Sequence, residues 1–278
     1  MENYKSLITE KFNKFLFSEI NLFYVGIFRI LLAIIILIVF FYVNASSQIL
    51  YTNFYKYFEI YDTYIITNAY LCLAAIPVIL FGLGIKPRLF GFISVVLLFP
   101  LIFQYGLHIS RQMLLATLLF FSFIKSDQVL SIKSILNKNI NITSQPIWPV
   151  RLIQIQLSVL YLINAAFKST PEFMSGEVLK GLSIMLPNFK VDLSSGFLDL
   201  GFITIPVAML GIATVVSEYY LVVGFWVKKL RIFTAIFGIV FHIILKQVVD
   251  IGFLDYVAVF LYLAFLFPWD SKYINKNI

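Results

Sequence analysis

The hydrophobic residues of this chain occur in runs long enough to cross a bilayer as helices, and this pattern restricts the fold more than any other feature. Hydrophobic residues make up 61% of the 278 residues, and charged residues make up only 13%. Soluble domains carry about a quarter charged residues, so the composition indicates an integral membrane protein. The runs have helix length and lack the alternation that is typical of membrane β-strands. We therefore expect an all-α bundle of transmembrane helices.

About eight such runs divide the chain into a membrane domain with short flanking segments. The expected spans are residues 21–43, 63–83, 89–107, 112–124, 150–167, 205–226, 232–249 and 253–267. Residues 1–20 mix charged and aromatic side chains and predict an interfacial helix, whereas residues 271–278 form a polar tail. Within the membrane domain, residues 21–270, the polar segment 125–149 predicts a linker. Residues 168–203 are the longest connection, and a connection of this length is typical of a functional or re-entrant loop.

Lysine and arginine are distributed unequally between the two sides of this bundle. The chain has 21 lysines and arginines. The termini and the connections on the same side hold 14 of them, the alternate connections hold 6, and Arg29 lies inside a span. Because cytoplasmic connections carry the excess of positive charge, we expect cytoplasmic termini, a cytoplasmic linker at 125–149 and an outer loop at 168–203. The chain is thus predicted to be a multi-pass protein of the cell (inner) membrane, with the lipid bilayer as a partner. The same bias accounts for the net charge of +7, so no nucleic acid partner is expected.

Several kinds of site are disfavoured by the residues present. Cys72 is the single cysteine, so neither an internal disulfide nor a cysteine-based metal site can form. The two histidines have no carboxylates at ligand spacing, so no metal site is expected. The sequence also has no glycine-rich phosphate loop and no Ser/His/Asp arrangement that can be ordered.

A group of polar residues is predicted to lie at one depth, near the outer surface of the membrane. Its members are His108, Arg111, Lys168, His242 and Lys246, with Gln247 next to the last. A lysine amine is a base only when it is neutral, and burial and neighbouring cations both favour the neutral form. Lys168 is therefore a candidate base. The alternatives are that the histidines are packed interior residues and that the cations are interfacial anchors.

Two further charges lie inside the expected spans. Arg29 falls in the first span and Glu218 in the sixth, at similar predicted depth. An isolated charge is costly in the bilayer, so we expect these two residues to form a structural pair.

The stretch YLINAAFKSTPEFMSG, residues 161–176, resembles the horizontally transferred transmembrane (HTTM) domain, the membrane module shared with vitamin K-dependent gamma-carboxylase. The family has a tyrosine, a lysine seven residues later, an aromatic residue and a glycine, which Tyr161, Lys168, Phe173 and Gly176 match. The aromatic residue is usually tryptophan in the family, so Phe173 is a departure.

Two other stretches carry the same resemblance, which covers roughly residues 20–270. FHIILKQVVDIGFLDYV is similar in register to a family segment with a histidine and a glutamine, here His242 and Gln247. LHISRQMLLA resembles the segment that holds the family's active-site histidine, here His108.

The resemblance implies roles for these residues. In the carboxylase the lysine that matches Lys168 deprotonates vitamin K hydroquinone, so a quinol is the candidate cofactor. His108 and His242 are expected to orient or stabilise the developing anion, as positioned donors can. The candidates for holding the cofactor are Arg111, Lys246 and Gln247. The carboxylase continues into a soluble region that binds its substrate, whereas this chain ends at Ile278, so we do not expect full carboxylation by this chain alone.

Two classes of function remain open at this point. Small bacterial members of the family include the membrane subunit of toxin-maturation systems of the sporulation-delaying type. This resemblance implies maturation or modification of a secreted peptide, with carboxylase- or epoxidase-like chemistry, and with a peptide precursor and a small accessory protein as partners. The alternative is a non-enzymatic membrane scaffold or immunity factor in a peptide toxin system. A small-solute transporter is less favoured, because the sequence shows no repeated halves with interrupted helices.

Overall fold

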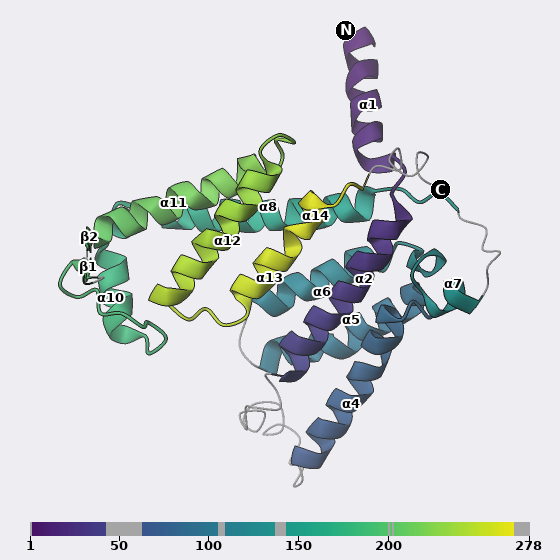
Figure 1. Ribbon diagram of the computed structural model, residues 1–278, viewed down its shortest axis with the longest axis horizontal. Helices are drawn as coiled ribbons and strands as arrows, with labels where there is room; N and C mark the ends of the chain where they lie inside the picture. The colour runs from purple at the N-terminus through teal and green to yellow at the C-terminus, as the bar shows by residue number, and fades with distance from the viewer. Residues whose placement is uncertain are drawn as a thin grey trace. The chain divides into compact units, whose positions relative to one another are not determined.

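The computed structural model describes residues 2–42, 63–104, 109–136, 143–199, 201 and 203–269, and these residues are mostly helical (Figure 1). The predicted catalytic candidate His108 lies outside them. The chain divides into two compact units. Unit 1 consists of Met1–Ile153 with Phe267–Ile278, and unit 2 consists of Gln154–Leu266.

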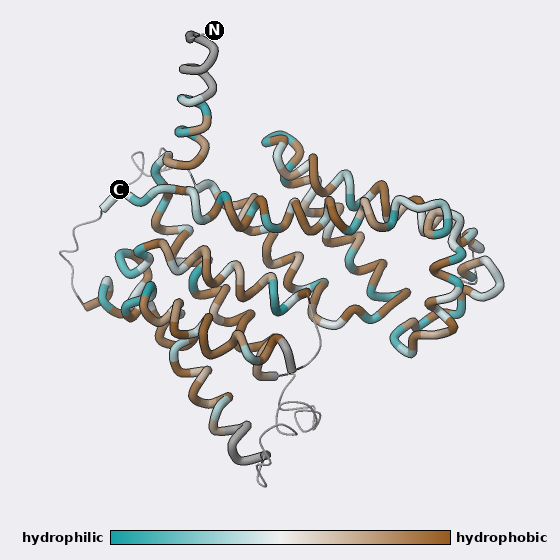
Figure 2. Tube along the Cα trace, turned by 180° about the vertical axis from the view of Figure 1, so that it is seen from behind, coloured by the Kyte–Doolittle hydropathy of each residue, from teal (hydrophilic) through white to brown (hydrophobic). Residues whose placement is uncertain are grey.

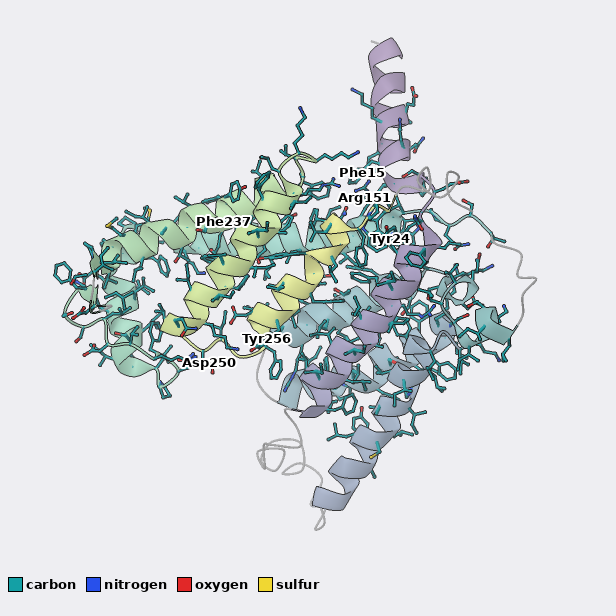
Figure 3. The ribbon with its side chains drawn as sticks, in the orientation of Figure 1. Phe15, Tyr24, Arg151, Phe237, Asp250 and Tyr256 are labelled. Atoms are coloured by element: carbon teal, nitrogen blue, oxygen red, sulfur yellow. The ribbon has the colours of Figure 1, made fainter. Side chains whose placement is uncertain are left out.

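Unit 1 is built from helices of the N-terminal half. They are α1 (Glu2–Phe17), α2 (Leu22–Leu37), which continues as the π-helix η1 (Ile38–Tyr42), α4 (Thr63–Gly82), α5 (Pro87–Gln104), α6 (Ile109–Phe121), the 3-10 helix η4 (Ser126–Gln128) and α7 (Ile132–Leu136). Helix α4 packs against α2 and α5, and α5 also packs against α6. The Arg151 guanidinium stacks on the Phe15 ring at 4.7 Å and donates to the Phe15 carbonyl, which fixes the end of α1 (Figure 3).

Unit 2 contains the rest of the helices and one strand pair. Helix α8 (Trp148–Lys168) begins before the division and continues into this unit. It is followed by α9 (Pro171–Met174), α10 (Glu177–Met185), β1 (Phe197–Asp199), β2 (Thr204–Pro206), α11 (Val207–Gly224), α12 (Arg231–Val248), α13 (Leu254–Leu261) and α14 (Leu263–Leu266). Helix α12 packs against α11, α13 and α14.

Each of the eight predicted spans coincides with a helix, but not all of these helices are long enough to cross a bilayer. Four are long and apolar enough within the described residues: Leu22–Phe41, Trp148–Lys168, Val207–Gly224 and Arg231–Val248. A fifth span results if Ile109–Phe121 and Ser126–Leu136, which are bent by 75°, are counted together. The remaining apolar helices, Ala69–Gly82, Pro87–Ile102 and Leu254–Leu266, are shorter. Hydrophobic residues follow the helices, and hydrophilic residues gather at the connections (Figure 2).

The described residues are mostly helical, as predicted, but the segment 168–203, expected as a long loop, contains secondary structure of its own. The segment forms α9 and α10, and its end pairs with the start of the next segment as an antiparallel hairpin, with Leu198 opposite Ile205. Leu193, Leu198 and Val207 are buried together beneath it. These apolar contacts stabilise strands that are too short to give a period-2 signal in the sequence.

Arg29 is fully buried in unit 1, and its guanidinium donates to backbone carbonyls of two separate segments. The Nε atom donates to the Gly82 carbonyl at 3.2 Å, and Nη1 and Nη2 donate to the carbonyls of Ser126 and Leu130. A carbonyl that is buried without a donor costs about 1–3 kcal/mol. Arg29 therefore holds the α4–α5 turn and the η4 segment against α2. The linker predicted at 125–149 is thus anchored to the helices at its start.

Gly84 allows the α4–α5 turn to come this close to Arg29. Its φ of +74° lies in the left-handed region that favours glycine. A Cβ atom at this position would come within 2.9 Å of the Arg29 Cζ atom and within 2.5 Å of the Ser131 Cβ atom. Both the backbone conformation and the available space therefore require glycine.

We expect the Arg29→Leu substitution to lower the free energy of unfolding by roughly 3 kcal/mol or more, because several buried carbonyls lose their donor together. Thermal unfolding of the full-length protein in detergent measures this change. The matched control is Arg88→Leu in the same unit, because Arg88 is exposed and donates to a single carbonyl, that of Phe123, at 2.8 Å. Equal destabilisation by the two substitutions would contradict the anchoring role of Arg29.

Candidate active site

Lys168, the predicted base, is the last residue of α8 in unit 2 and forms an ion pair. The Lys168 Nζ atom lies 2.6 Å from Oε1 of Glu218, which comes from the middle of α11. The Glu218 side chain is only 5% exposed, whereas that of Lys168 is 32% exposed. The ammonium also lies 5.9 Å from the centre of the Phe173 ring. The second carboxylate oxygen of Glu218, Oε2, is buried and has no hydrogen-bond partner among the described residues.

A chain of buried hydrogen bonds lies in the same unit. The Tyr161 hydroxyl is 2.9 Å from Nε2 of His242 and 2.6 Å from the hydroxyl of Tyr262, and Nδ1 of His242 is 2.7 Å from Oδ1 of Asp255. One consistent set of donors runs from Tyr262 to Tyr161, from Tyr161 to Nε2, and from the Nδ1–H group to Asp255. Asp255 thereby orients the imidazole. Its Oδ2 atom, like Oε2 of Glu218, is buried without a hydrogen-bond partner among the described residues.

The helical spacing of the sequence brings the ion pair and the hydrogen-bond chain into one region. Tyr161 and Lys168 are seven residues apart, so they lie on one face of α8 two turns apart. The Glu218 carboxylate is close enough to interact electrostatically with both Tyr161 and His242. Gly238 makes room for the chain, because a Cβ atom there would lie 2.6 Å from the Tyr262 hydroxyl oxygen.

An apolar cavity of about 230 Å³ lies in unit 2 between α10, α11 and α12. Its lining is almost wholly hydrophobic and includes Phe237 of α12, which is labelled in Figure 3. The polar residues of the lining are Thr214 and Ser217 of α11. Ser217 directly precedes Glu218 in the sequence. A cavity of this size and composition suits an aromatic or hydrocarbon group of a lipid-soluble molecule.

The other predicted site residues have separate surroundings. Arg111 is buried in α6 of unit 1, with its guanidinium 5.9 Å from the Phe40 ring. Lys246 in unit 2 donates to the hydroxyl of Tyr256, the first-turn residue of α13 labelled in Figure 3. Gln247 is exposed on α12.

Two expectations concern the partners of these charges. Each member of the predicted Arg29–Glu218 pair has other partners within its own unit: Lys168 pairs with Glu218, and backbone carbonyls accept from Arg29. The sequence argument also placed cations next to Lys168, whereas the charged group in contact with it is a carboxylate. The charge pattern predicts only depth along the helices, and depth alone does not tell which helices are neighbours.

Asp255 and Tyr262 were missed by the sequence reasoning. Asp255 carried a usable signal, since an acidic residue at the start of an apolar run is costly without a partner. His242 lies on the preceding helix and was the natural candidate. Tyr262 carried no such signal, because a tyrosine in an aromatic-rich membrane segment is ordinary.

The comparison with known proteins identifies the family of this chain. The family model of the HTTM domain matches residues 17–269. This chain belongs to the HTTM-domain family. It is thus a membrane protein of the family related to gamma-carboxylase. No curated protein and no solved structure matches the chain.

The buried ion pair makes a measurable prediction for this HTTM protein. In a double-mutant cycle with Lys168→Gln and Glu218→Gln, we expect a coupling free energy of about 1–3 kcal/mol in thermal or chemical unfolding, because Glu218 is almost fully buried. The matched control is the exposed pair Lys180–Glu177, at 2.8 Å, for which the same cycle should give less than about 0.5 kcal/mol. Similar coupling in both cycles would show that burial adds nothing to the Lys168–Glu218 pair.

Proposed function

We propose that this HTTM protein is a membrane enzyme that removes a proton from a lipid-soluble quinol at Lys168 and uses this chemistry to modify or mature a secreted peptide. The observation that carries the proposal is the Lys168–Glu218 pair, in which the buried Oε2 atom has no hydrogen-bond partner among the described residues. A buried carboxylate oxygen without a donor is costly, so such an atom is suited to receive a proton or a ligand hydroxyl.

The ion pair offers a way to prepare the base. Oε1 of the almost fully buried Glu218 lies 2.6 Å from the Lys168 Nζ atom, so the ammonium has a direct acceptor for its proton. The resulting neutral amine can accept a proton from an acidic hydroxyl nearby. Lys168 thus does not need the neighbouring cations that the sequence argument invoked.

The residues of unit 2 fit a quinol. The apolar cavity beside α11 can take a hydrophobic ring or chain, and the carboxylate of Glu218 can accept a hydroxyl hydrogen bond. When bound, a quinol would supply an ionisable hydroxyl, and oxidation of its anion by molecular oxygen would give the strong base that removes a proton from a peptide side chain. His242, oriented by Asp255, holds the Tyr161 hydroxyl in place and can relay a proton along the hydrogen-bond chain.

The membrane arrangement is part of the proposal. Eight spans with both termini in the cytoplasm are supported by the match of each predicted span to a helix and by the bias of positive charge. This topology places the Lys168 end of α8 toward the outside of the cell membrane. A secreted peptide precursor and a small accessory protein would then meet the site from the outer side.

The alternative proposal is a non-enzymatic scaffold or immunity factor. The exposed apolar end of α10 favours it, since Ile184 is 70% and Met185 is 78% exposed. A peptide partner could cover these side chains. In that case Ile184→Asp would abolish the cellular phenotype while Lys168→Ala would preserve it. The enzyme proposal requires the opposite sensitivity at Lys168.

We expect Lys168→Ala to reduce quinol epoxidation or oxidation by the purified full-length protein at least 100-fold, because a positioned base contributes roughly 100- to 10,000-fold. Membrane abundance should stay unchanged. Lys180→Ala is the matched control, since it also removes a lysine paired with a glutamate, and it should keep full activity. Normal activity of the Lys168→Ala protein would exclude the catalytic role.

A further inference from the structure

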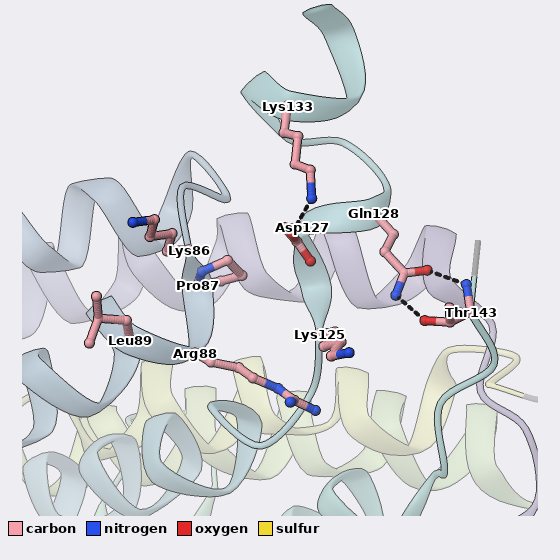
Figure 4. A pocket seen from close by; sticks show the side chains of 9 residues that line it. All are labelled: Lys86, Pro87, Arg88, Leu89, Lys125, Asp127, Gln128, Lys133 and Thr143. Atoms are coloured by element: carbon pink, nitrogen blue, oxygen red, sulfur yellow. Dashed lines mark hydrogen bonds and ion pairs between the residues drawn. The ribbon is translucent and has the colours of Figure 1, made fainter. Parts of the chain in front are cut away.

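Unit 1 contains a second pocket, which is unrelated to the candidate active site. Its volume is about 460 Å³, and it is formed by the α4–α5 turn, the segment around η4, Lys133 of α7, and Thr143 (Figure 4). The residues that line it are Lys86, Pro87, Arg88, Leu89, Lys125, Asp127, Gln128, Lys133 and Thr143. Four of these nine are cations and one is acidic, so the pocket carries a formal charge of +3.

Most of this positive charge is not neutralised by the protein. Lys133 pairs with Asp127 at 3.1 Å. Within the described ranges, no carboxylate forms an ion pair with Lys86, Arg88 or Lys125. The pocket also lies at the N-terminal end of α5, where the helix dipole adds to the positive potential. Three like charges that line one pocket repel one another, and an anion in the pocket relieves this repulsion.

The pocket is formed by segments that are held in place. The Gln128 side chain holds Thr143 next to η4. Its Nε2 donates to Thr143 Oγ1 at 2.8 Å, and its Oε1 accepts from the Thr143 amide at 2.7 Å (Figure 4). The Ser131 hydroxyl donates to the Asp127 carbonyl at 2.6 Å. The buried Arg29 fixes both the α4–α5 turn and the η4 segment from below. The cations are therefore presented by a firm backbone.

The surroundings of the pocket are apolar as well as basic. Leu89, which lines it, is 51% exposed, and Ile135 and Leu136 of α7 are 76% and 77% exposed. Exposure of these apolar side chains to water is unfavourable, whereas at a membrane surface they can contact acyl chains. A ligand with a negative headgroup and hydrocarbon chains satisfies both features at once.

The geometry points to a binding site for the phosphate-bearing headgroup of an anionic phospholipid. The phosphate lies among Lys86, Arg88 and Lys125, and the acyl chains lie beside Leu89. Under the topology proposed above, these connections face the cytoplasm, where basic pockets next to membrane helices bind such headgroups. Phosphate chemistry could also come from a soluble phosphate ester, but the exposed apolar side chains favour the lipid.

The test is lipid binding by the full-length protein purified in detergent, measured by native mass spectrometry with phosphatidylglycerol and with phosphatidylcholine. We expect phosphatidylglycerol to bind more tightly. The variant Lys86→Asn/Lys125→Gln keeps a residue tolerant of the positive φ of Lys86 and removes two charges. Each cation near an anionic lipid contributes about fivefold in affinity, so the variant should bind phosphatidylglycerol roughly 25-fold more weakly.

The matched control is Lys228→Gln/Lys229→Gln, which removes two exposed cations of unit 2 outside the pocket and should leave binding within about twofold. If the first variant does not fold, Lys125→Gln alone should still weaken binding about fivefold. Equal binding of the two lipids, or equal loss in both double variants, would overturn the site. Displacement of the lipid by millimolar inorganic pyrophosphate, or binding of pyrophosphate alone, would overturn the lipid assignment in favour of a soluble phosphate compound.

Discussion

The cost of burying charge in an apolar environment is the constraint on which this structure depends. The described residues meet it in three different ways. Arg29 is surrounded by backbone carbonyls, Glu218 is paired with a lysine at the edge of its unit, and Asp255 is paired with a buried histidine. The first arrangement uses every polar group and makes a rigid anchor. Glu218 and Asp255 each keep one carboxylate oxygen without a hydrogen-bond partner among the described residues. These open acceptors distinguish the candidate active site from the structural site around Arg29.

The candidate active site follows from a small number of helix contacts in unit 2. Residues seven apart on α8 present Tyr161 and Lys168 to one side, and α11 and α12 supply Glu218 and His242. Packing of α12 against α13 brings Asp255 to the imidazole. The result places a partly exposed amine, two buried carboxylates and a buried imidazole in one unit. Groups of this kind are suited to moving protons.

Much of the architecture could be predicted from the sequence, because runs of apolar residues reveal helices directly. The membrane class and the positions of the helical segments were both accessible in this way. Partners were harder to predict. Only the packing of the helices shows that Lys168 pairs with Glu218, because the sequence offered both Arg29 and Lys168 as cations that could neutralise it. The carbonyls that receive Arg29 have no sequence signal at all, because every residue carries one.

The connections were the part that the sequence described least well. Residues 168–203 read as a loop, yet they form two short helices and one strand of a hairpin over a small apolar core. The polar segment 125–149 was predicted to be a linker, yet the buried Arg29 guanidinium holds its start against α2. Short elements of this kind depend on contacts with distant residues, so local periodicity cannot reveal them.

The central claim is that Lys168, prepared by Glu218, takes a proton from a bound acidic hydroxyl. The absorbance spectrum of a non-oxidisable phenolic ligand such as 1-naphthol, bound to the full-length protein, tests this claim most directly. The account predicts the spectrum of the naphtholate anion at a pH at which free naphthol is neutral, and its loss in Lys168→Gln. A neutral naphthol spectrum in the wild-type protein, with the ligand bound, would contradict the account.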